Sequence, residues 1–259
     1  YLKDPLNELR KVNLEKDDER DEGFVTDILS LLKDLEFQLI DVDNARDFHT
    51  LGGWDLLVAL VPEDSHVENK TISKLSRSTE SKIRAVQAHA AWTMGTAVKN
   101  TGEFYPYAVE KIKVGTKMTT ALDTVLDVFC QNYKEEDWWP IRTLMTKSVY
   151  AIGSFLRGNR LAQAHLLRND GAAKLSDKLR HLVMNNLKAD VKLLQRLLSL
   201  ASDIITDIQL DGDKADPTLN DSIVKAFTTP EWCDMISTVL TSENFLPIRV
   251  QETVMETVQ

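Results

Sequence analysis

The sequence predicts an all-α protein in which helical repeats stack into a right-handed solenoid. Three observations carry this prediction. Apolar residues recur at three-and-four spacing through most of the chain, a helix–corner–helix pattern returns along it, and no segment shows convincing period-two alternation. The 259 residues include only ten glycines and seven prolines, which is few for the turn-rich chains of β-sandwiches and barrels.

The composition fits a globular protein with an acidic surface. Hydrophobic residues make up 43% of the chain, charged residues 27%, and the formal net charge is -9. An acidic surface repels phosphate backbones, so nucleic acid is not an expected partner. No apolar run approaches the roughly 20 residues of a membrane span, so membrane insertion is not expected. We expect a monomer with an acidic polar segment at 1–23, helical or partly ordered, and a single repeat domain at 24–259.

The first elements follow from the apolar spacing. A buried stripe predicts a helix over 24–48, the Gly52-Gly53 pair interrupts it, and the apolar run 54–61 ends at Pro62. The polar segment 63–81 is interpreted as a connector or part-ordered insert. A helix over 81–99 follows, with Asn100, Thr101 and Gly102 as its stop signal. The stripe of the first helix consists of Val25, Ile28, Leu29, Leu32, Leu35 and Leu39.

The later elements are again helical. A short helix is predicted over 103–114 and a longer one over 118–133. The segment 135–140 is predicted to be a loop, because Pro140 disfavours helical geometry at Trp139. A polar loop is predicted over 209–221. The remaining helical segments are 141–159, 162–183, 190–208, 222–240 and 247–258.

A glycine inside the helix over 81–99 indicates close contact with a second helix. Gly95 costs about 1 kcal/mol relative to alanine in a helix interior, so the position calls for a reason. The segment AAWTMGTAV aligns with SVYAIGSFL, which places Trp92 over Tyr150 and Gly95 over Gly153, and RLLSLASDI is a weaker third copy. We therefore predict that neighbouring helices cross closely at both glycines, with the two aromatic residues on the inner groove or in the core.

The corners between helices also recur. Each copy joins a long helix to an asparagine-bearing corner, a short helix and a further apolar helix. The three copies are VDNARDFHTLGGWDLLVAL, VKNTGEFYPYAVEKIKV and LRGNRLAQAHLLRNDGAAKL. Such a unit cannot bury its apolar face alone, so the copies are expected to stack. We expect an armadillo-like α-solenoid, a right-handed superhelix of helical repeats. The repeat period, roughly 50–58 residues, exceeds the roughly 40–47 of armadillo and HEAT units, and insertions between helices would explain the excess.

Catalytic and cofactor motifs are absent from the sequence. There is no P-loop, dinucleotide fingerprint, HExxH, CxxC or GxSxG motif, and the five histidines are scattered. Near-matches to a P-loop at 114–119 and to a calcium loop at 211–216 lack defining residues. We therefore expect no catalytic residues, no metal site and no cofactor, and we disfavour an enzyme.

The cysteines and the glycosylation sequons carry weaker signals. Cys130 and Cys233 are interpreted as small buried hydrophobic residues rather than as one long-range bridge. Sequons begin at Asn69 and Asn220, both in polar segments that we expect to be exposed, so they permit glycosylation in a secretory compartment.

Two segments resemble the armadillo-type nucleotide exchange factors of seventy-kilodalton heat-shock chaperones. VDNARDFHTLGGWDLLVAL is similar to the first-repeat corner of that family, and AAWTMGTAVKN is similar to its second-repeat helix. SVYAIGSFLRGN looks like the third-repeat helix, and the Trp232-Cys233 pair of PEWCDMISTVL resembles the branch in the endoplasmic reticulum lumen. The chain departs from the pattern at KIKVGTKM and over 203–222. The matching residues are Asp43, Asn44, Ala45, Asp47, Phe48, Gly52, Gly53, Ala90, Ala91, Gly95, Thr96 and Asn100.

The resemblance implies a binding function without catalytic residues. Such a factor grips the ATPase domain of the lumenal chaperone BiP, holds its nucleotide cleft open and promotes ADP release, which supports protein folding and translocation. The implied location is the endoplasmic reticulum lumen, with the cytoplasm as the alternative. Helix-face geometry selects as partner-binding residues His89, Trp92, Thr96, Lys99, Asn100, Tyr150, Ser154 and Arg157.

Structural roles and a second function compete with this interpretation. Asn44 and Asn100 can equally cap helix ends. An armadillo scaffold or cargo adaptor would bind an extended peptide in its groove, using regular ladders of tryptophan and asparagine. Thr96 and Ser154 stand where that ladder would carry asparagine, so the sequence favours a domain-sized partner.

Overall fold

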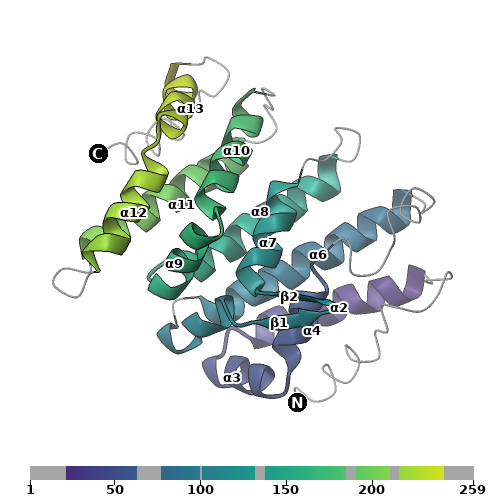
Figure 1. Ribbon diagram of the computed structural model, residues 1–259. Coiled ribbons are helices and arrows are strands. Elements are labelled where there is room, and N and C mark those ends of the chain that lie inside the picture. Colours follow the sequence, from purple (N-terminus) through teal and green to yellow (C-terminus); the bar gives the residue numbers. More distant parts are fainter. Residues whose placement is uncertain are drawn as a thin grey trace. The chain divides into compact units, whose positions relative to one another are not determined.

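Helices dominate the computed structural model of the chain, which confirms the predicted all-α class (Figure 1). The structure describes residues 22–62, 77–99, 101–131, 138–184, 191–210 and 216–241. It divides the chain into two compact units, Tyr1–Phe155 and Leu156–Gln259. The single domain expected over 24–259 stays a prediction, and the segments 1–21 and 247–258 lie outside the described residues.

Unit 1 consists of helices and one β-hairpin, with the long helix α6 contacted by several of the others. Helix α2 packs along α6, and α4 and η1 contact α6 as well. The elements of unit 1 are α2 (Glu22–Gln38), α3 (Val42–Thr50), α4 (Gly53–Ala59), α6 (Arg77–Val98), the 3-10 helix η1 (Gly102–Ala108), β1 (Ile112–Val114), β2 (Lys117–Thr119), α7 (Ala121–Cys130) and α8 (Trp138–Leu156).

The predicted helix over 24–48 is wrong as one element, because the chain turns between α2 and α3. Asp41 caps α3, and its carboxylate accepts hydrogen bonds from the backbone N–H groups of Asp43 and Asn44, each at 3.0 Å. The Asn44 side chain donates to the carbonyl of Gln38 at 3.1 Å and so closes the end of α2. The structure thus confirms the helix-capping alternative for Asn44.

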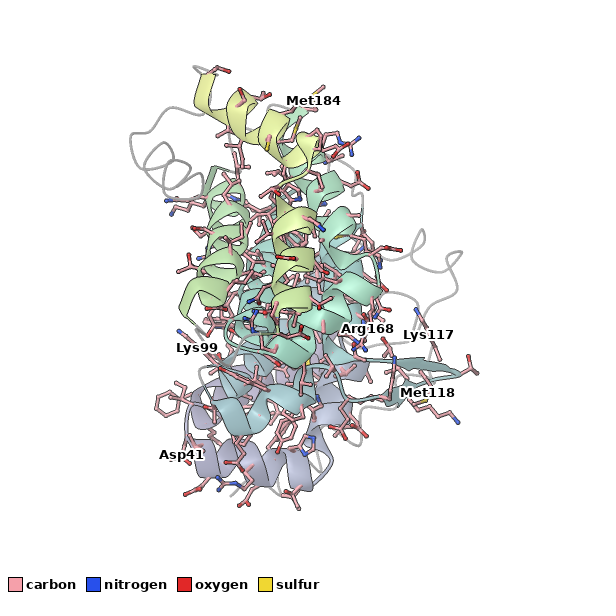
Figure 2. All side chains as sticks on the ribbon, turned by 60° about the vertical axis from the view of Figure 1, so that its left-hand side comes forward. Asp41, Lys99, Lys117, Met118, Arg168 and Met184 are labelled. Carbon is pink, nitrogen blue, oxygen red and sulfur yellow. The ribbon has the colours of Figure 1, made fainter. Side chains whose placement is uncertain are left out.

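A short β-hairpin replaces the end of the helix predicted over 103–114 and the start of the helix predicted over 118–133. β1 and β2 pair antiparallel, with Ile112 opposite Thr119, and Gly115 takes φ 60° in the turn between them. That left-handed geometry suits glycine, which has no side chain to clash. Figure 2 shows Lys117 and Met118 on this hairpin, extending away from the helices of unit 1. The segment 114–119, which matched a P-loop only in part, therefore consists of the last residue of β1, the hairpin turn and β2.

Helix α8 begins earlier than the sequence predicted. The loop predicted over 135–140 extends too far, because α8 already includes Trp138, Trp139 and Pro140. Proline is tolerated in the first helical turn, where its missing N–H has no intrahelical partner to lose. The helix predicted over 141–159 is confirmed up to Leu156, where α8 ends, and its last three residues lie outside the helix.

Gly95 lies where α6 and α8 approach each other, as the sequence predicted. A Cβ atom at Gly95 would sit 2.9 Å from Cα of Ala151 and 3.0 Å from Cε1 of Tyr150, both on α8. The first of these neighbours is backbone and cannot rotate away. The counterpart, Gly153, is buried within α8, and a close crossing at that residue stays a prediction.

Replacing Gly95 with alanine is expected to destabilise unit 1. Alanine gains about 1 kcal/mol of helix propensity, whereas overpacking of a tight contact costs about 1–3 kcal/mol. We expect a net loss of about 1 kcal/mol in the free energy of unfolding, measured by urea titration. Gly102→Ala is the matched control, because the nearest heavy atom to its Cβ would be 3.9 Å away. Equal stability of the two variants would contradict the close approach.

Unit 2 is built from helices that pack in sequence around α10. Helix α10 contacts α9, α11, α12 and α13, and α12 also packs on α9 and α11. Its core includes Leu175, Leu198 and Trp232, each at most 1% exposed. The elements of unit 2 are α9 (Arg160–Arg168), α10 (Gly171–Met184), α11 (Val191–Leu210), α12 (Pro217–Phe227) and α13 (Pro230–Thr241).

Several predicted boundaries in unit 2 are corrected. The segment 162–183 is two helices joined by a corner at Asn169 and Asp170, and 222–240 is split before Pro230. Helix α11 agrees with the prediction over 190–208. The polar loop predicted over 209–221 is wrong at both ends, because α11 runs to Leu210 and α12 begins at Pro217. Asp216 caps α12 through its side chain, and Pro217 is the first residue of the helix. The sequence around this Asp-Pro pair predicts a loop, although proline is common at the first position of a helix.

Both cysteines are free thiols, but one of them is not buried. Cys130 is half-buried, whereas Cys233 is exposed, so the predicted burial of Cys233 is wrong. Trp232 and Val239 of α13 face the core, and Cys233 follows Trp232 by one residue, about 100° around the helix. Across the described part of the chain, no helix combines the length and apolar character that crossing a bilayer requires.

Candidate protein-binding face

One surface of unit 1 gathers five of the residues selected from the sequence. His89, Trp92 and Thr96 follow each other at three- and four-residue spacing on α6, so they lie on one side of that helix. Lys99 continues the same spacing directly after the end of α6. We call the surface around them the α6 face. Its members are Lys33 and Glu36 of α2, His89, Trp92, Thr96 and Lys99 at α6, and Lys147 and Tyr150 of α8.

Trp92 lies at the centre of the α6 face. Its side chain is half-buried, its ring centroid is 5.7 Å from that of His89, and the ammonium group of Lys147 lies over its ring. A cation over a tryptophan ring is attracted by the ring's negative face. Trp92 thus joins α6 to α8 while part of its ring stays accessible.

A second cation–aromatic contact repeats this arrangement further along α6. The Nζ atom of Lys99, just beyond the end of α6, lies 5.7 Å from the ring centroid of Tyr150 on α8. Figure 2 shows Lys99 at the surface of unit 1. Between the two contacts, Thr96 donates a hydrogen bond to the carboxylate of Glu36 at 3.3 Å. Three helices therefore contribute to one continuous surface.

The other selected residues lie elsewhere or outside the described part of the chain. Ser154 is only 4% exposed, and its hydroxyl donates to the carbonyl of Tyr150 at 3.1 Å, so it presents little surface. Arg157 belongs to unit 2, where it pairs with Asp203 at 2.5 Å. Asn100 lies outside the described residues. The structure therefore brings together five of the eight residues that the sequence selected.

The two sequons are placed differently from each other. Asn69 lies outside the described residues. Asn220 is in the first part of α12 rather than in the predicted exposed loop, and its side chain is half-buried. Its Oδ1 atom finds no hydrogen-bond partner among the described residues. Glycosylation at both positions stays a prediction.

The α6 face is rich in positive charge although the whole chain is acidic. Lys33, Lys99 and Lys147 contribute three cations, against the carboxylate of Glu36. Burial, followed by the charges of Lys33 and Lys147, lowers the pKa of His89 below its ordinary value of 6.5. A neutral His89 avoids adding a further positive charge beside two lysines. This pattern suits a partner surface that carries carboxylates.

Acidification is expected to destabilise unit 1 through His89. In the unfolded chain His89 binds a proton as the pH falls through 6.5, whereas in the folded chain it stays neutral to a lower pH. Stability is therefore lost as the pH falls below 6.5 and regained above it. We expect urea titrations at pH 7 and about pH 5 to show this loss, and His89→Gln to reduce it.

His181→Gln provides a control for this pH dependence. Burial and the charge of Lys178 also lower the pKa of His181, but this residue lies in unit 2. Amide hydrogen exchange in α6 should therefore keep its pH dependence in His181→Gln and lose part of it in His89→Gln. An unchanged pH dependence in His89→Gln would exclude His89 as its source.

Sequence reasoning missed Lys33, Glu36 and Lys147. A partial signal existed for Lys147, which precedes Tyr150 by three residues and so shares its side of α8. No sequence signal showed that α2 and α8 flank the same side of α6. Among the described residues, no three His, Cys, Asp or Glu side chains form a candidate metal site. Comparison with models of known protein families and with curated proteins gives no match for this chain.

Proposed function

We propose that this protein is a nucleotide exchange factor that binds the ATPase domain of the lumenal chaperone BiP and promotes ADP release. The observation that carries the proposal is the α6 face, where Trp92 and Tyr150 lie under lysines at equivalent positions of two neighbouring long helices. Tryptophan and tyrosine are among the residues most enriched at the energetic centres of protein interfaces. The motif resemblance supplies the family and the lumenal location.

The proposed architecture is an armadillo-like right-handed solenoid. The order of elements in unit 1 supports this architecture, because corners with short helices separate the long helices α2, α6 and α8. Helices that lie side by side and cross closely, as α6 and α8 do at Gly95, make a stiff surface. A stiff surface can hold a bound domain in one shape without ordering itself first.

The proposed mechanism is a competition between two shapes of the chaperone cleft. The exchange factor binds the open shape more tightly, ADP favours the closed one, and the coupling between the two ligands is reciprocal. To change the cleft from almost entirely closed to almost entirely open, the exchange factor must bind the open shape about 5.5 kcal/mol more tightly than the closed shape. Exposed ion pairs contribute about 1 kcal/mol or less each, so a broad interface centred on Trp92 has to supply most of it. This chain forms no covalent bond in the cycle.

A scaffold or cargo adaptor that binds an extended peptide is the second candidate. The row of Trp92 and Tyr150 on the α6 face is also compatible with a peptide groove. Such grooves bind the peptide backbone through a regular asparagine ladder, whereas Thr96 here donates to Glu36 and Ser154 is buried. These contacts favour a folded partner over a peptide.

The direct test is the release rate of fluorescent ADP from purified BiP, with and without saturating protein. We expect acceleration that saturates with protein concentration, and a smaller effect on a cytosolic heat-shock chaperone. Unchanged release from both chaperones would exclude exchange activity and favour the scaffold. Preferential action on the cytosolic chaperone would instead move the proposed location to the cytoplasm.

A further inference from the structure

A cavity of about 330 Å³ lies within unit 2, where the α9–α10 corner faces the α12–α13 turn. Ala172 of α10 and Ala226 of α12 form part of its apolar wall. Asp170, Ser176 and Glu231 contribute polar groups from three different segments. The volume falls in the usual range of small ligand sites, so the space can receive a side chain or a small molecule.

The charged residues around this cavity leave it negative. Three carboxylates, of Asp170, Asp177 and Glu231, line it together with one guanidinium, that of Arg180, which leaves two net negative charges. Arg180 is already paired with Asp177. The backbone N–H of Glu231 and the Thr229 hydroxyl, then the charge of Arg180, lower the pKa of Glu231, so its carboxylate is ionised at neutral pH.

Ser176 provides an independent observation that points to a ligand. It lines the cavity and is only 7% exposed, and its hydroxyl finds no hydrogen-bond partner among the described residues. Leaving a buried hydroxyl unpaired is unfavourable, and most buried polar groups in proteins have a partner. A bound N–H group in the cavity would give the Ser176 oxygen that partner.

We propose that this cavity binds the basic side chain, arginine or lysine, of a partner polypeptide. The aliphatic stem would lie along Ala172 and Ala226, and the cationic head would lie between the carboxylates of Asp170 and Glu231, with the Ser176 oxygen as a further acceptor. An anionic ligand would meet the two excess negative charges and is disfavoured. The inference does not depend on the proposed exchange function, because the α6 face belongs to unit 1.

The test is an NMR titration of the whole ¹⁵N-labelled chain with a capped Gly-Gly-Arg-Gly-Gly peptide. We expect saturable shifts of the amides at 170–180 and 226–231, with a Kd on the order of 1 mM. A peptide with citrulline in place of arginine keeps the shape and loses the charge, and it should bind roughly tenfold more weakly. Equal binding of both peptides, or no saturable shifts at these amides, would overturn the proposal.

Two variants test the named contacts. Asp170→Asn with Glu231→Gln should weaken arginine-peptide binding roughly tenfold, and asparagine tolerates the φ of 55° at position 170. Ser176→Ala should weaken it several-fold while the chain stays folded, because the hydroxyl has no partner to lose in the free protein. If the double variant does not fold, Ser176→Ala decides. Unchanged affinity in Ser176→Ala then contradicts the assigned contact.

Two further controls test whether binding depends on the carboxylates of this cavity and whether the ligand is a peptide side chain or a free amine. Asp27→Asn with Asp47→Asn removes two exposed carboxylates in unit 1 and should leave peptide binding unchanged. Titration with spermidine, a free polyamine, compares the affinity of the cavity for a free amine with its affinity for the arginine peptide. Tighter binding of spermidine than of the arginine peptide would overturn the assignment to a polypeptide partner.

Discussion

Replacing Trp54 with alanine is expected to lower the free energy of unfolding of unit 1 by about 3–5 kcal/mol. Trp54 is 1% exposed, and its indole N–H donates to the carbonyl of Tyr107 at 3.1 Å. Its ring packs at a tilt against Tyr107 and edge-on against Phe155, with centroids 5.9 and 6.4 Å away. The variant loses this packing and also leaves the Tyr107 carbonyl without its donor.

Matched variants separate these contributions. Trp54→Phe keeps much of the ring and should cost less than Trp54→Ala, with the lost hydrogen bond as the main difference. Phe37→Ala also removes an aromatic ring, but Phe37 is 77% exposed and the change should be within about 0.5 kcal/mol. Amide hydrogen exchange in α4 and η1 reports on unit 1 even if the two units unfold separately. Equal losses in Trp54→Ala and Phe37→Ala would contradict the described core.

Replacing Trp92 with alanine is expected to weaken the complex with BiP by about 2 kcal/mol or more, roughly 30-fold in Kd. Trp92 is half-buried and central in the α6 face, with Lys147 over its ring. The loss of its ring also removes the surface on which Lys147 rests. Because part of the ring is accessible, the cost to folding should stay at about 1–2 kcal/mol, below that of Trp54→Ala.

The control for Trp92→Ala is another exposed apolar residue of unit 1. Met118 is 56% exposed on the β-hairpin, and Met118→Ala should leave the affinity for BiP unchanged. Affinity measured by calorimetry and stability measured by urea titration together decide the outcome. Unaltered affinity of Trp92→Ala would mean that the α6 face is not the binding surface. Loss of the cooperative thermal unfolding transition in Trp92→Ala would instead show that Trp92 belongs to the core.

Helix existence was predictable from apolar spacing, whereas helix ends were not. The stripe containing Leu32, Leu35 and Leu39 is buried as predicted, yet the chain turns just after it because Asp41 caps the next helix. The hairpin was missed because each strand spans three residues, too few for a period-two pattern to stand out. In both cases a local capping or turn residue overrides the longer apolar period.

The candidate site was predictable along one helix and not between helices. Three- and four-residue spacing placed His89, Trp92 and Lys99 on one side of α6, and Gly95 indicated a close neighbour. Which residues of α2 and α8 stand beside them depends on how the helices pack, and spacing within one helix does not contain that information. Ser154 illustrates the same limit, because its alignment with Thr96 did not predict that its side chain would be buried.

The free thiols have a practical consequence, because each unit carries one. Cys130 lies in unit 1 and is half-buried, whereas Cys233 lies in unit 2 and is exposed. A maleimide dye should therefore modify Cys233 first, since access limits the reaction of a half-buried thiol. Sequential labelling of the unaltered chain would then place a donor and an acceptor fluorophore on different units. Energy transfer between the two dyes would measure the distance between the two labelled thiols in solution.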